Sequence, residues 1–468
     1  MNKARPAVDR EGAFLSLLQI GVATADITPP IGISANPWGK SKSAISRGVH
    51  KPMEATVAAI SSDGDRDISL IYGLDLGWIG CHECDVVNFR SRLARELNLD
   101  IDSILVNLSQ THKGPPFCIH EPAREGGELV AGYVEQTIQD LIAAGKRAIQ
   151  SRVKADLTWA YGKCALGSVR DLVVTDGEST QVVVGYNPEL EPDDTLVVGR
   201  VTDQSGKIIL TIVNYGCHPT SVGWESDLIS PDYVGRAREL VVEATGAPML
   251  FLLGACGNVA PKEQYSGDTS VADRNGEMLG YATLATLASM LAPSHELRFD
   301  QVITSGSNLA SWLPTKVEAN DLFDRKKISV EMPHKELLTD EQMRVAWAPL
   351  TATEVFLNFR IRKQHEIRID YVTGDGTVKH PVWIWQLGDA IVIAHGGEAY
   401  LELVRDLRRR NADRMIVFLD MTNGPGYLYL PTKIAYEQNN YQSQQSIVAS
   451  GGVEIMLEVL DKAIKSLS

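Results

Sequence analysis

Along the first third of the chain, short apolar runs alternate with segments whose apolar residues recur at helical spacing. The short runs have the length of buried strands and end at turn-forming or polar residues. They lie at residues 17–25, 55–61, 68–74 and 104–106. Residues 86–97 and 130–149 each carry one apolar face and are predicted to be helices. The resulting order, β-β-α-β-α, is typical of a layered α/β fold in which helices flank a mixed sheet.

The middle third is rich in predicted strands. They lie at residues 153–161, 180–184, 196–201, 207–213 and 248–253. Ser230-Pro231-Asp232 predicts a helix start, because serine caps a helix and proline fits its first turn. Another helix is expected at 271–291. Residues 312–350 are polar and irregular, and we expect a surface excursion with one helix near 340–347.

The last part of the chain returns to strands and helices. Strands are predicted at residues 354–361, 366–372, 378–387, 389–394 and 415–420. Helices are predicted at 399–409 and 443–466, and Gly451-Gly452 is expected to break or kink the second one. Without repeats or a change in composition, the simplest division is a loose lead at 1–16 and one domain at 17–468.

Two predicted strands end in the same way, with polar residues, a histidine and a proline. The first leads to His112 and the second to His218, so both imidazoles are expected at the mouth of one site. Glu398 also follows a predicted strand. Two imidazoles and a carboxylate are a common ligand set for catalytic zinc. The alternatives are hydrogen-bonded structural histidines and a glutamate favoured by a helix N-terminus.

Composition restricts the partners. The chain has 468 residues, of which 44% are hydrophobic and 22% charged, and a net charge of −14. This acidity argues against nucleic acid and anionic membranes as main partners, because phosphate attraction requires clustered Lys and Arg. No apolar run approaches the roughly 18 residues that a membrane-spanning helix needs. The first residues also lack the features of a signal peptide, which predicts a cytoplasmic protein.

The six cysteines are scattered and are expected to be mostly free and buried. Cys81 and Cys84 have the spacing of half a zinc site, but no second Cys-x-x-Cys completes it, so a loop is favoured. A cysteine nucleophile among Cys118, Cys217 and Cys256 remains an alternative. It is weakened for Cys217, since an extended strand would point it away from His218.

Six short motifs occur along the chain. They are Asp26-Ile27-Thr28-Pro29-Pro30, Thr111-His112-Lys113-Gly114-Pro115, Asn214-Tyr215-Gly216-Cys217-His218-Pro219-Thr220, Gly257-Asn258-Val259-Ala260-Pro261, Gly397-Glu398 and Tyr429-Leu430-Pro431-Thr432. In this order they resemble the catalytic domain of the neutral/alkaline (non-lysosomal) ceramidase family over roughly residues 21–460. The resemblance implies a ceramidase-like α/β fold and zinc-dependent amidase activity. We expect no counterpart of the family's C-terminal immunoglobulin-like domain.

The resemblance also implies roles for individual residues. His218, Glu398 and Tyr429 correspond to zinc ligands of the family. His112 corresponds to a histidine beside the metal-bound water, where it can relay a proton or steady the oxyanion. Arg170 corresponds to an arginine near the scissile group, where it can stabilise negative charge.

Several positions depart from the family pattern. Gln110 replaces the first histidine ligand, and glutamine is a poor zinc ligand, so either three protein groups hold the metal or His112 becomes the fourth. Gly254 stands near a family serine, and Asn258 replaces an aspartate. Asp75, at the end of a predicted strand, is expected either to support a ligand or to cap the next segment.

The sequence therefore predicts a zinc-dependent hydrolase of an amide (N-acyl) bond in a small or medium-sized molecule. Two alternatives remain: a non-catalytic ligand-binding protein on the same fold, and an esterase or lactonase that uses the same metal site. A homo-oligomer is compatible with the sequence, which does not specify an oligomeric state.

Overall fold

Two sheets stacked face to face form the centre of the molecule. The computed structural model describes residues 18–62, 67–79, 86–117, 125–177, 179–318, 320–350, 353–424 and 428–467. The larger sheet has eight strands in the order β13-β11-β10-β6-β1-β3-β4-β5 and the smaller has four in the order β17-β18-β19-β21. The larger sheet contains β1 (Gln19–Asp26), β3 (Glu54–Ser61), β4 (Ser69–Leu74), β5 (Ile104–Leu108), β6 (Val153–Lys163), β10 (Thr195–Asp203), β11 (Ile208–Tyr215) and β13 (Met249–Leu253). The smaller contains β17 (Phe323–Pro333), β18 (Thr377–Leu387), β19 (Ala390–His395) and β21 (Met415–Leu419).

Alternation along the strands separates three hydrophobic layers. In β21, Val417 packs between the two sheets, whereas its neighbours Ile416 and Phe418 belong to the layer on the far side of the smaller sheet. In β5, Leu105 packs between the sheets and Val106 belongs to the layer outside the larger sheet. Successive side chains of a strand point to opposite faces, so each strand serves two layers. This explains why the strands read as continuous apolar runs.

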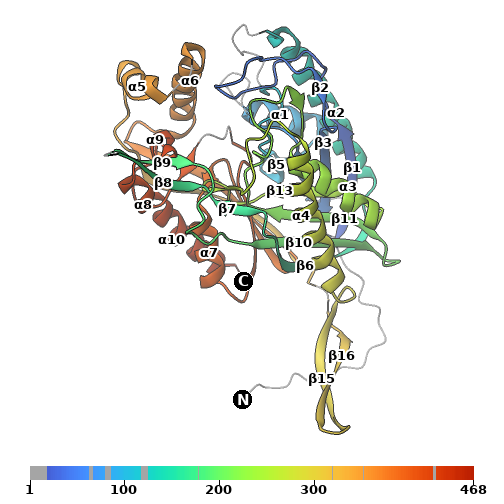
Figure 1. Cartoon of the computed structure of the whole chain (residues 1–468). Helices are drawn as coiled ribbons and strands as arrows, with labels where there is room; N and C mark the ends of the chain where they lie inside the picture. The colour runs from blue at the N-terminus through green and yellow to red at the C-terminus, as the bar shows by residue number, and fades with distance from the viewer. Residues whose placement is uncertain are drawn as a thin grey trace.

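Helices cover both outer faces (Figure 1). The larger sheet contacts α1 (Val86–Leu97), α2 (Val130–Gln150), α3 (Tyr233–Thr245) and α4 (Ser270–Ser289). The smaller sheet contacts α6 (Glu354–Tyr371), α7 (Leu401–Arg410) and α10 (Gly452–Lys465). The layers run helix, sheet, sheet, helix, which confirms the predicted α/β layered fold. None of the helices in the described ranges is both long and apolar enough to cross a membrane.

Shorter elements complete the structure. The remaining α-helices are α5 (Asp340–Trp347), α8 (Lys433–Glu437) and α9 (Tyr441–Gln445), and 3-10 turns occupy Ile101–Ser103, Gly127–Leu129 and Ala348–Leu350. Two-stranded pairs are β2 (Gly48–Val49) with β12 (Leu228–Ile229), β7 (Gly167–Val169) with β14 (Val259–Pro261), β8 (Asp171–Asp176) with β9 (Ser179–Val184), β15 (His295–Thr304) with β16 (Asn308–Lys316), and β20 (Glu398–Ala399) with β22 (Tyr429–Leu430).

The prediction of two strands at 354–361 and 366–372 is wrong, because these residues form the single helix α6. The buried apolar residues Leu357, Ile361 and Ile367 do recur at helical spacing. However, Arg360 and Lys363 are buried on the same helix, where they line a cavity. Polar residues on the inner side of the helix interrupt the apolar pattern from which a helix is recognised.

Two further predictions from the sequence differ from the structure. The predicted helix at 443–466 is divided into α9 and α10, and Gly451, at φ 97°, is the N-cap of the second. The expected excursion at 312–350 contains the predicted helix α5, but also the end of β16 and the long strand β17, which pairs along its whole length with β18.

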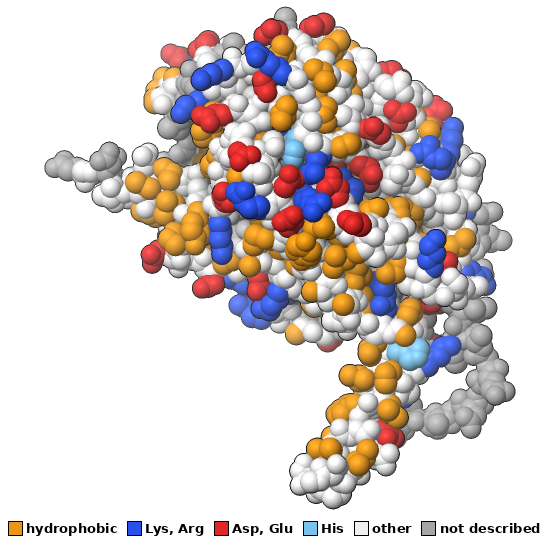
Figure 2. Space-filling view, turned by 45° about the vertical axis from the view of Figure 1, so that its right-hand side comes forward, with side chains coloured by type: hydrophobic (Ala, Val, Ile, Leu, Met, Phe, Trp, Pro, Cys, Tyr) orange, Lys and Arg blue, Asp and Glu red, His pale blue; other side chains and the backbone are white. Residues whose placement is uncertain are grey.

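The β15–β16 hairpin extends away from the body of the molecule (Figure 1). Apolar side chains are spread along it (Figure 2), and Phe299 and Trp312 are each more than half exposed. Their rings lie edge to face with centroids 5.9 Å apart. The hairpin is therefore held by its own cross-strand contacts and contributes nothing to the packed layers.

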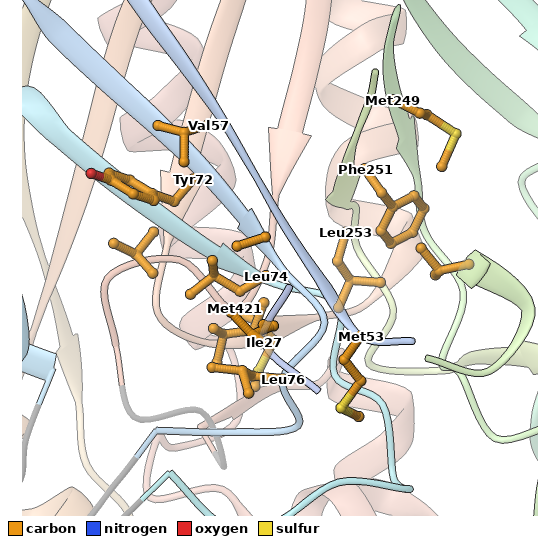
Figure 3. Packing of buried hydrophobic residues seen from close by; sticks show 14 of the residues in the cluster. Ile27, Met53, Val57, Tyr72, Leu74, Leu76, Met249, Phe251, Leu253 and Met421 are labelled. Atoms are coloured by element: carbon orange, nitrogen blue, oxygen red, sulfur yellow. The ribbon is translucent and has the colours of Figure 1, made fainter. Parts of the chain in front are cut away.

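The side chain of Asn107, at the end of β5, ties the two sheets together. Its Oδ1 accepts a hydrogen bond from the backbone N–H of Leu253 (2.8 Å), and its Nδ2 donates to the carbonyl of Asp420 (2.7 Å) and to Thr422 Oγ1 (2.9 Å). Nearby, Met421 joins the hydrophobic cluster of the larger sheet (Figure 3). One amide thus connects β5, β13 and the chain after β21.

Replacing Asn107 by alanine should lower the free energy of unfolding by roughly 2–4 kcal/mol, because buried backbone groups at Leu253 and Asp420 lose their partners. Chemical denaturation followed by circular dichroism measures this change. Asn308→Ala, on the exposed hairpin, serves as the control and should stay within about 0.5 kcal/mol of the wild type. An Asn107 variant as stable as the control would contradict the proposed tie.

Candidate functional site

The candidate site lies where parallel strand pairs of both sheets end. The pairs β4–β5 and β11–β13 belong to the larger sheet and β19–β21 to the smaller one. Gln110 follows β5, His218 follows β11, Cys256 follows β13 and Glu398 follows β19. Because parallel strands place their carboxyl ends at the same edge, these four side chains meet although they are far apart in sequence.

His218 and Glu398 face each other in the protein interior. His218 Nδ1 lies 2.6 Å from the carbonyl of Cys256 and 3.1 Å from that of Val259, and Nε2 lies 3.0 Å from Glu398 Oε2. A carbonyl can only accept, so Nδ1 carries the hydrogen, and in a neutral ring Nε2 presents a lone pair to the carboxylate. Burial, together with the charge of Arg170, lowers the pKa of His218 and favours that neutral ring.

The Nε2 atom of a neutral His218 and the Glu398 carboxylate are both hydrogen-bond acceptors, so their contact requires a positive charge between them. Burial raises the pKa of Glu398, but contact with a protonated His218 and the charge of Arg170 outweigh this and lower it, so the carboxylate is ionised when a positive charge lies between the two residues. A proton or a metal ion can supply the missing charge. Imidazole nitrogen and carboxylate oxygen are suitable donors for zinc, so these residues fit the metal that the resemblance implies.

Cys256 completes a group of potential metal ligands. Its thiol, the imidazole of His218 and the carboxylate of Glu398 each offer one atom, and these atoms all lie within 4.8 Å of one another. All three residues are buried. The sequence had suggested Cys256 only as an alternative nucleophile, since nothing in the local pattern places it beside the other two residues.

The two described cysteines near the site do not have the character of nucleophiles. Burial raises the pKa of Cys217 and that of Cys256 well above the ordinary value for a thiol, whereas reactive cysteines have a lowered pKa. Cys164, Cys217 and Cys256 are free thiols, as predicted. Cys81, Cys84 and Cys118 lie outside the described residues.

Gln110 occupies the position where the resemblance places a histidine ligand. Its Oε1 accepts a hydrogen bond from Cys256 Sγ (3.3 Å), and its side chain is also hydrogen-bonded to Glu398. Its φ of 64° is rare for a residue with a long side chain. Hydrogen bonds from Gln110 N–H to Leu76 and from His112 Nδ1 to the Gln110 carbonyl, both 2.9 Å, hold this conformation.

His112 lies beside the proposed metal ligands. Its ring centroid is 6.1 Å from that of His218 and 5.2 Å from that of Trp38. Because Nδ1 donates to the carbonyl of Gln110, Nε2 is left as an acceptor. Burial and the proximity of His218 lower the pKa of His112 to about 3, so the ring is neutral at physiological pH.

Arg170 and Tyr429 form a second layer around Glu398. Arg170 Nη2 donates to the carbonyl of Gly257 (2.7 Å) and to Tyr429 Oη (3.3 Å). Tyr429 pairs with Glu398 through β20 and β22. Tyr429 lines the cavity in front of the site, whereas Arg170 is not among its lining residues. The guanidinium therefore acts on the site through its hydrogen bond to the tyrosine hydroxyl and through its charge beside His218 and Glu398.

Asp75 and Gly254 lie away from this cavity. Asp75 forms a two-pronged ion pair with Arg238 (2.8 and 2.9 Å) and accepts from the backbone N–H of Glu54 (2.9 Å). It fixes the packing of α3 on the sheet. Gly254 lines a different cavity, and a Cβ there would lie 2.9 Å from the backbone nitrogen of Gly216. Its small size permits this close approach.

A cavity of about 180 Å³ opens in front of His112, Glu398 and Tyr429. Most of its wall is aromatic or apolar, with Arg360 and Lys363 of α6 as charged members. The aromatic lining residues are Trp38, Trp78, Phe356, Phe359, Tyr429 and Tyr441. A few polar groups in a mostly apolar cavity are typical of a small-molecule site.

Asp420 is a supporting residue that sequence reasoning missed. Its Oδ2 accepts hydrogen bonds from the backbone N–H groups of Cys256 and Ala399, both at 2.9 Å. Its Oδ1 bonds His395 Nε2 (2.8 Å), and His395 Nδ1 lies 2.9 Å from His380 Nε2. One carboxylate thus holds the two turns that carry Cys256 and Glu398. Its place as the last residue of a predicted strand was the available signal.

Two solved structures are similar to this one. A neutral ceramidase from Pseudomonas aeruginosa superposes with a TM-score of 0.66 and 14% sequence identity, over 96% of this chain and 73% of that chain. A ceramidase complexed with C2 gives a TM-score of 0.64, 14% identity and coverages of 96% and 74%. The fold is that of neutral ceramidase. No family model matches the sequence, and no curated protein matches it.

The ceramidase fold thus confirms the resemblance at the level of architecture. At 14% identity, a shared fold leaves the chemistry to be argued from the site itself.

Lys113 anchors the loop that carries Gln110 and His112. It is almost fully buried, and its Nζ donates to Asn36 Oδ1 (3.1 Å) and to the carbonyl of Ser226. Burial lowers its pKa to about 8. In the unfolded chain the lysine titrates near its ordinary value of about 10.4. Above about pH 8 the unfolded state therefore binds more protons, so stability due to Lys113 rises with pH.

Lys113→Met removes the titrating group and should remove this rise. The free energy of unfolding of the wild type, minus that of the variant, should rise by roughly 2–3 kcal/mol from pH 7.5 to pH 10.5. Denaturant titrations across this range measure the difference. Lys163→Met, at an exposed position of β6, serves as the control for the loss of a lysine. A flat profile for Lys113→Met would mean that the buried amine titrates normally.

Proposed function

We propose that this chain is a metal-dependent hydrolase that cleaves an amide bond of a small or medium-sized molecule. The observation that carries the proposal is the buried contact between His218 Nε2 and the Glu398 carboxylate. Two acceptors held at 3.0 Å, next to a cavity that admits a small molecule, are suited to a divalent cation. His218 and Glu398 would hold zinc, with Tyr429 as a further ligand.

When bound in such a site, zinc activates water and polarises an acyl carbonyl. The side chains around it have complementary roles. His112 enters the reaction as a neutral imidazole with Nε2 as the acceptor, so it can take a proton from water and pass it to the leaving amine. Burial and the charge of Glu398 raise the pKa of Tyr429 well above its ordinary value, and the charge and hydrogen bond of Arg170 oppose this rise.

The cavity wall positions the substrate. Its aromatic side chains exclude water and bury the apolar part of the acyl or amine group. Glu398 and His112 line the same cavity, so a bound amide can reach both. These features support a small-molecule amide substrate.

We also propose that the protein acts in the cytoplasm.

Metal content and hydrolysis after chelation test the proposal. Purified protein should carry about one zinc per chain, and dialysis against a chelator should abolish hydrolysis across a panel of N-acyl amides until zinc is restored. An ester panel measured in parallel identifies an esterase or lactonase. Protein that binds zinc and panel compounds without turnover would be a binding protein, and hydrolysis by metal-free protein would refute the metal mechanism.

His218→Ala should lose metal and lower kcat/KM by more than about 100-fold, because it removes the nitrogen that faces Glu398. Metal analysis and steady-state kinetics measure both effects. His365→Ala is the matched control, since His365 is exposed on α6 and pairs with Asp340. It should keep full metal content and activity. Stoichiometric zinc in His218→Ala would show that His218 is not a ligand.

A further inference from the structure

We propose that the thiolate of Cys256 is a metal ligand that replaces the histidine missing at position 110. The ion is then held by His218, Cys256 and Glu398, with Tyr429 as the further ligand. This inference rests on the metal centre proposed above, but it concerns the donor that takes the place of the missing histidine. In the sequence analysis, the place of the missing histidine either stayed without a protein ligand or was taken by His112.

The backbone holds Cys256 in position from both sides. Its N–H donates to Asp420 Oδ2 (2.9 Å), and its carbonyl accepts from His218 Nδ1 (2.6 Å). The next residue, Gly257, packs so closely on the strand of Glu398 that a Cβ would lie 2.7 Å from the Glu398 carbonyl. The turn thus brings the sulfur to the two other donors, and the three donor atoms lie within 4.8 Å of one another.

Gln110 has the contacts of a supporting residue. Its side chain bridges Cys256 Sγ, at 3.3 Å, and the Glu398 carboxylate, so it touches two proposed ligands at once. Outer groups that hydrogen-bond to ligands orient them and tune the metal. Gln110 thus supports both proposed ligands from the position where the resemblance implies a histidine.

A thiolate changes which metal the site prefers. Sulfur donors favour zinc and other soft or borderline ions over magnesium and calcium. Thiolate and carboxylate together carry two negative charges, which balance one divalent cation in the buried site. Cobalt(II) replaces zinc in such sites and gives a sulfur-to-metal charge-transfer band, which reports the thiolate without any assay of activity.

The test is to load the metal-free full-length chain with Co2+ and record its near-ultraviolet and visible spectrum. The wild type should bind one Co2+ and show the charge-transfer band. Cys256→Ser should lose the band and weaken metal binding by more than about 100-fold. Cys217→Ser is the matched control, because Cys217 is equally buried next to His218, and it should keep the band. Gln110→His combined with Cys256→Ser should recover affinity without the band.

X-ray absorption of the zinc-loaded wild type provides a second readout that needs no variant to fold. It should reveal one sulfur at about 2.3 Å from zinc. One bound metal without sulfur, or a band that persists in Cys256→Ser, would overturn this inference and leave the metal-dependent hydrolase standing. Wild-type protein that binds neither ion would overturn both.

Discussion

The amide of Asn107 is the constraint on which the site depends. It joins the ends of β5 and β13 to the chain after β21, which fixes the smaller sheet against the larger one. Asn214 reinforces this link, because its Nδ2 donates to the carbonyls of Leu252 and Phe418. Hydrophobic packing between the sheets is strong but tolerates sliding, whereas these hydrogen bonds are directional. They fix the strand ends relative to one another, and the residues of the candidate site come shortly after those ends in the sequence.

Residues with strained backbone conformations are concentrated around the candidate site. Gln110, Met421 and Asn423 all have positive φ, and Gln110 and Met421 both line the cavity. Such conformations cost free energy and persist only where surrounding contacts enforce them. Here the enforcing contacts include Asn423 Oδ1, which accepts from the backbone N–H of Val106 at 2.9 Å. The stability of the stacked sheets therefore maintains the unusual backbone that turns the side chains of the site inward.

The sequence predicted the layered fold and the strand ends that carry His218 and Glu398, because strand length and alternation are local properties. It also identified Gln110 as the position to be explained. It did not predict that Cys256 lies beside them, since that contact arises only when two sheets stack. The single helix α6 was missed for a related reason. Part of its inner side faces a cavity, so buried Arg360 and Lys363 interrupt its apolar periodicity.

The proposed metal ligands lie far apart in the sequence, which has a consequence for biosynthesis. His218 and Cys256 leave the ribosome before Glu398, Asp420 and Tyr429, and the smaller sheet that carries the later residues cannot stack until β21 has emerged. A nascent chain therefore exposes two of the donors without the carboxylate or the supporting Asp420. The proposed metal ligands can therefore come together only after the smaller sheet has stacked, so the proposed site is completed late in folding.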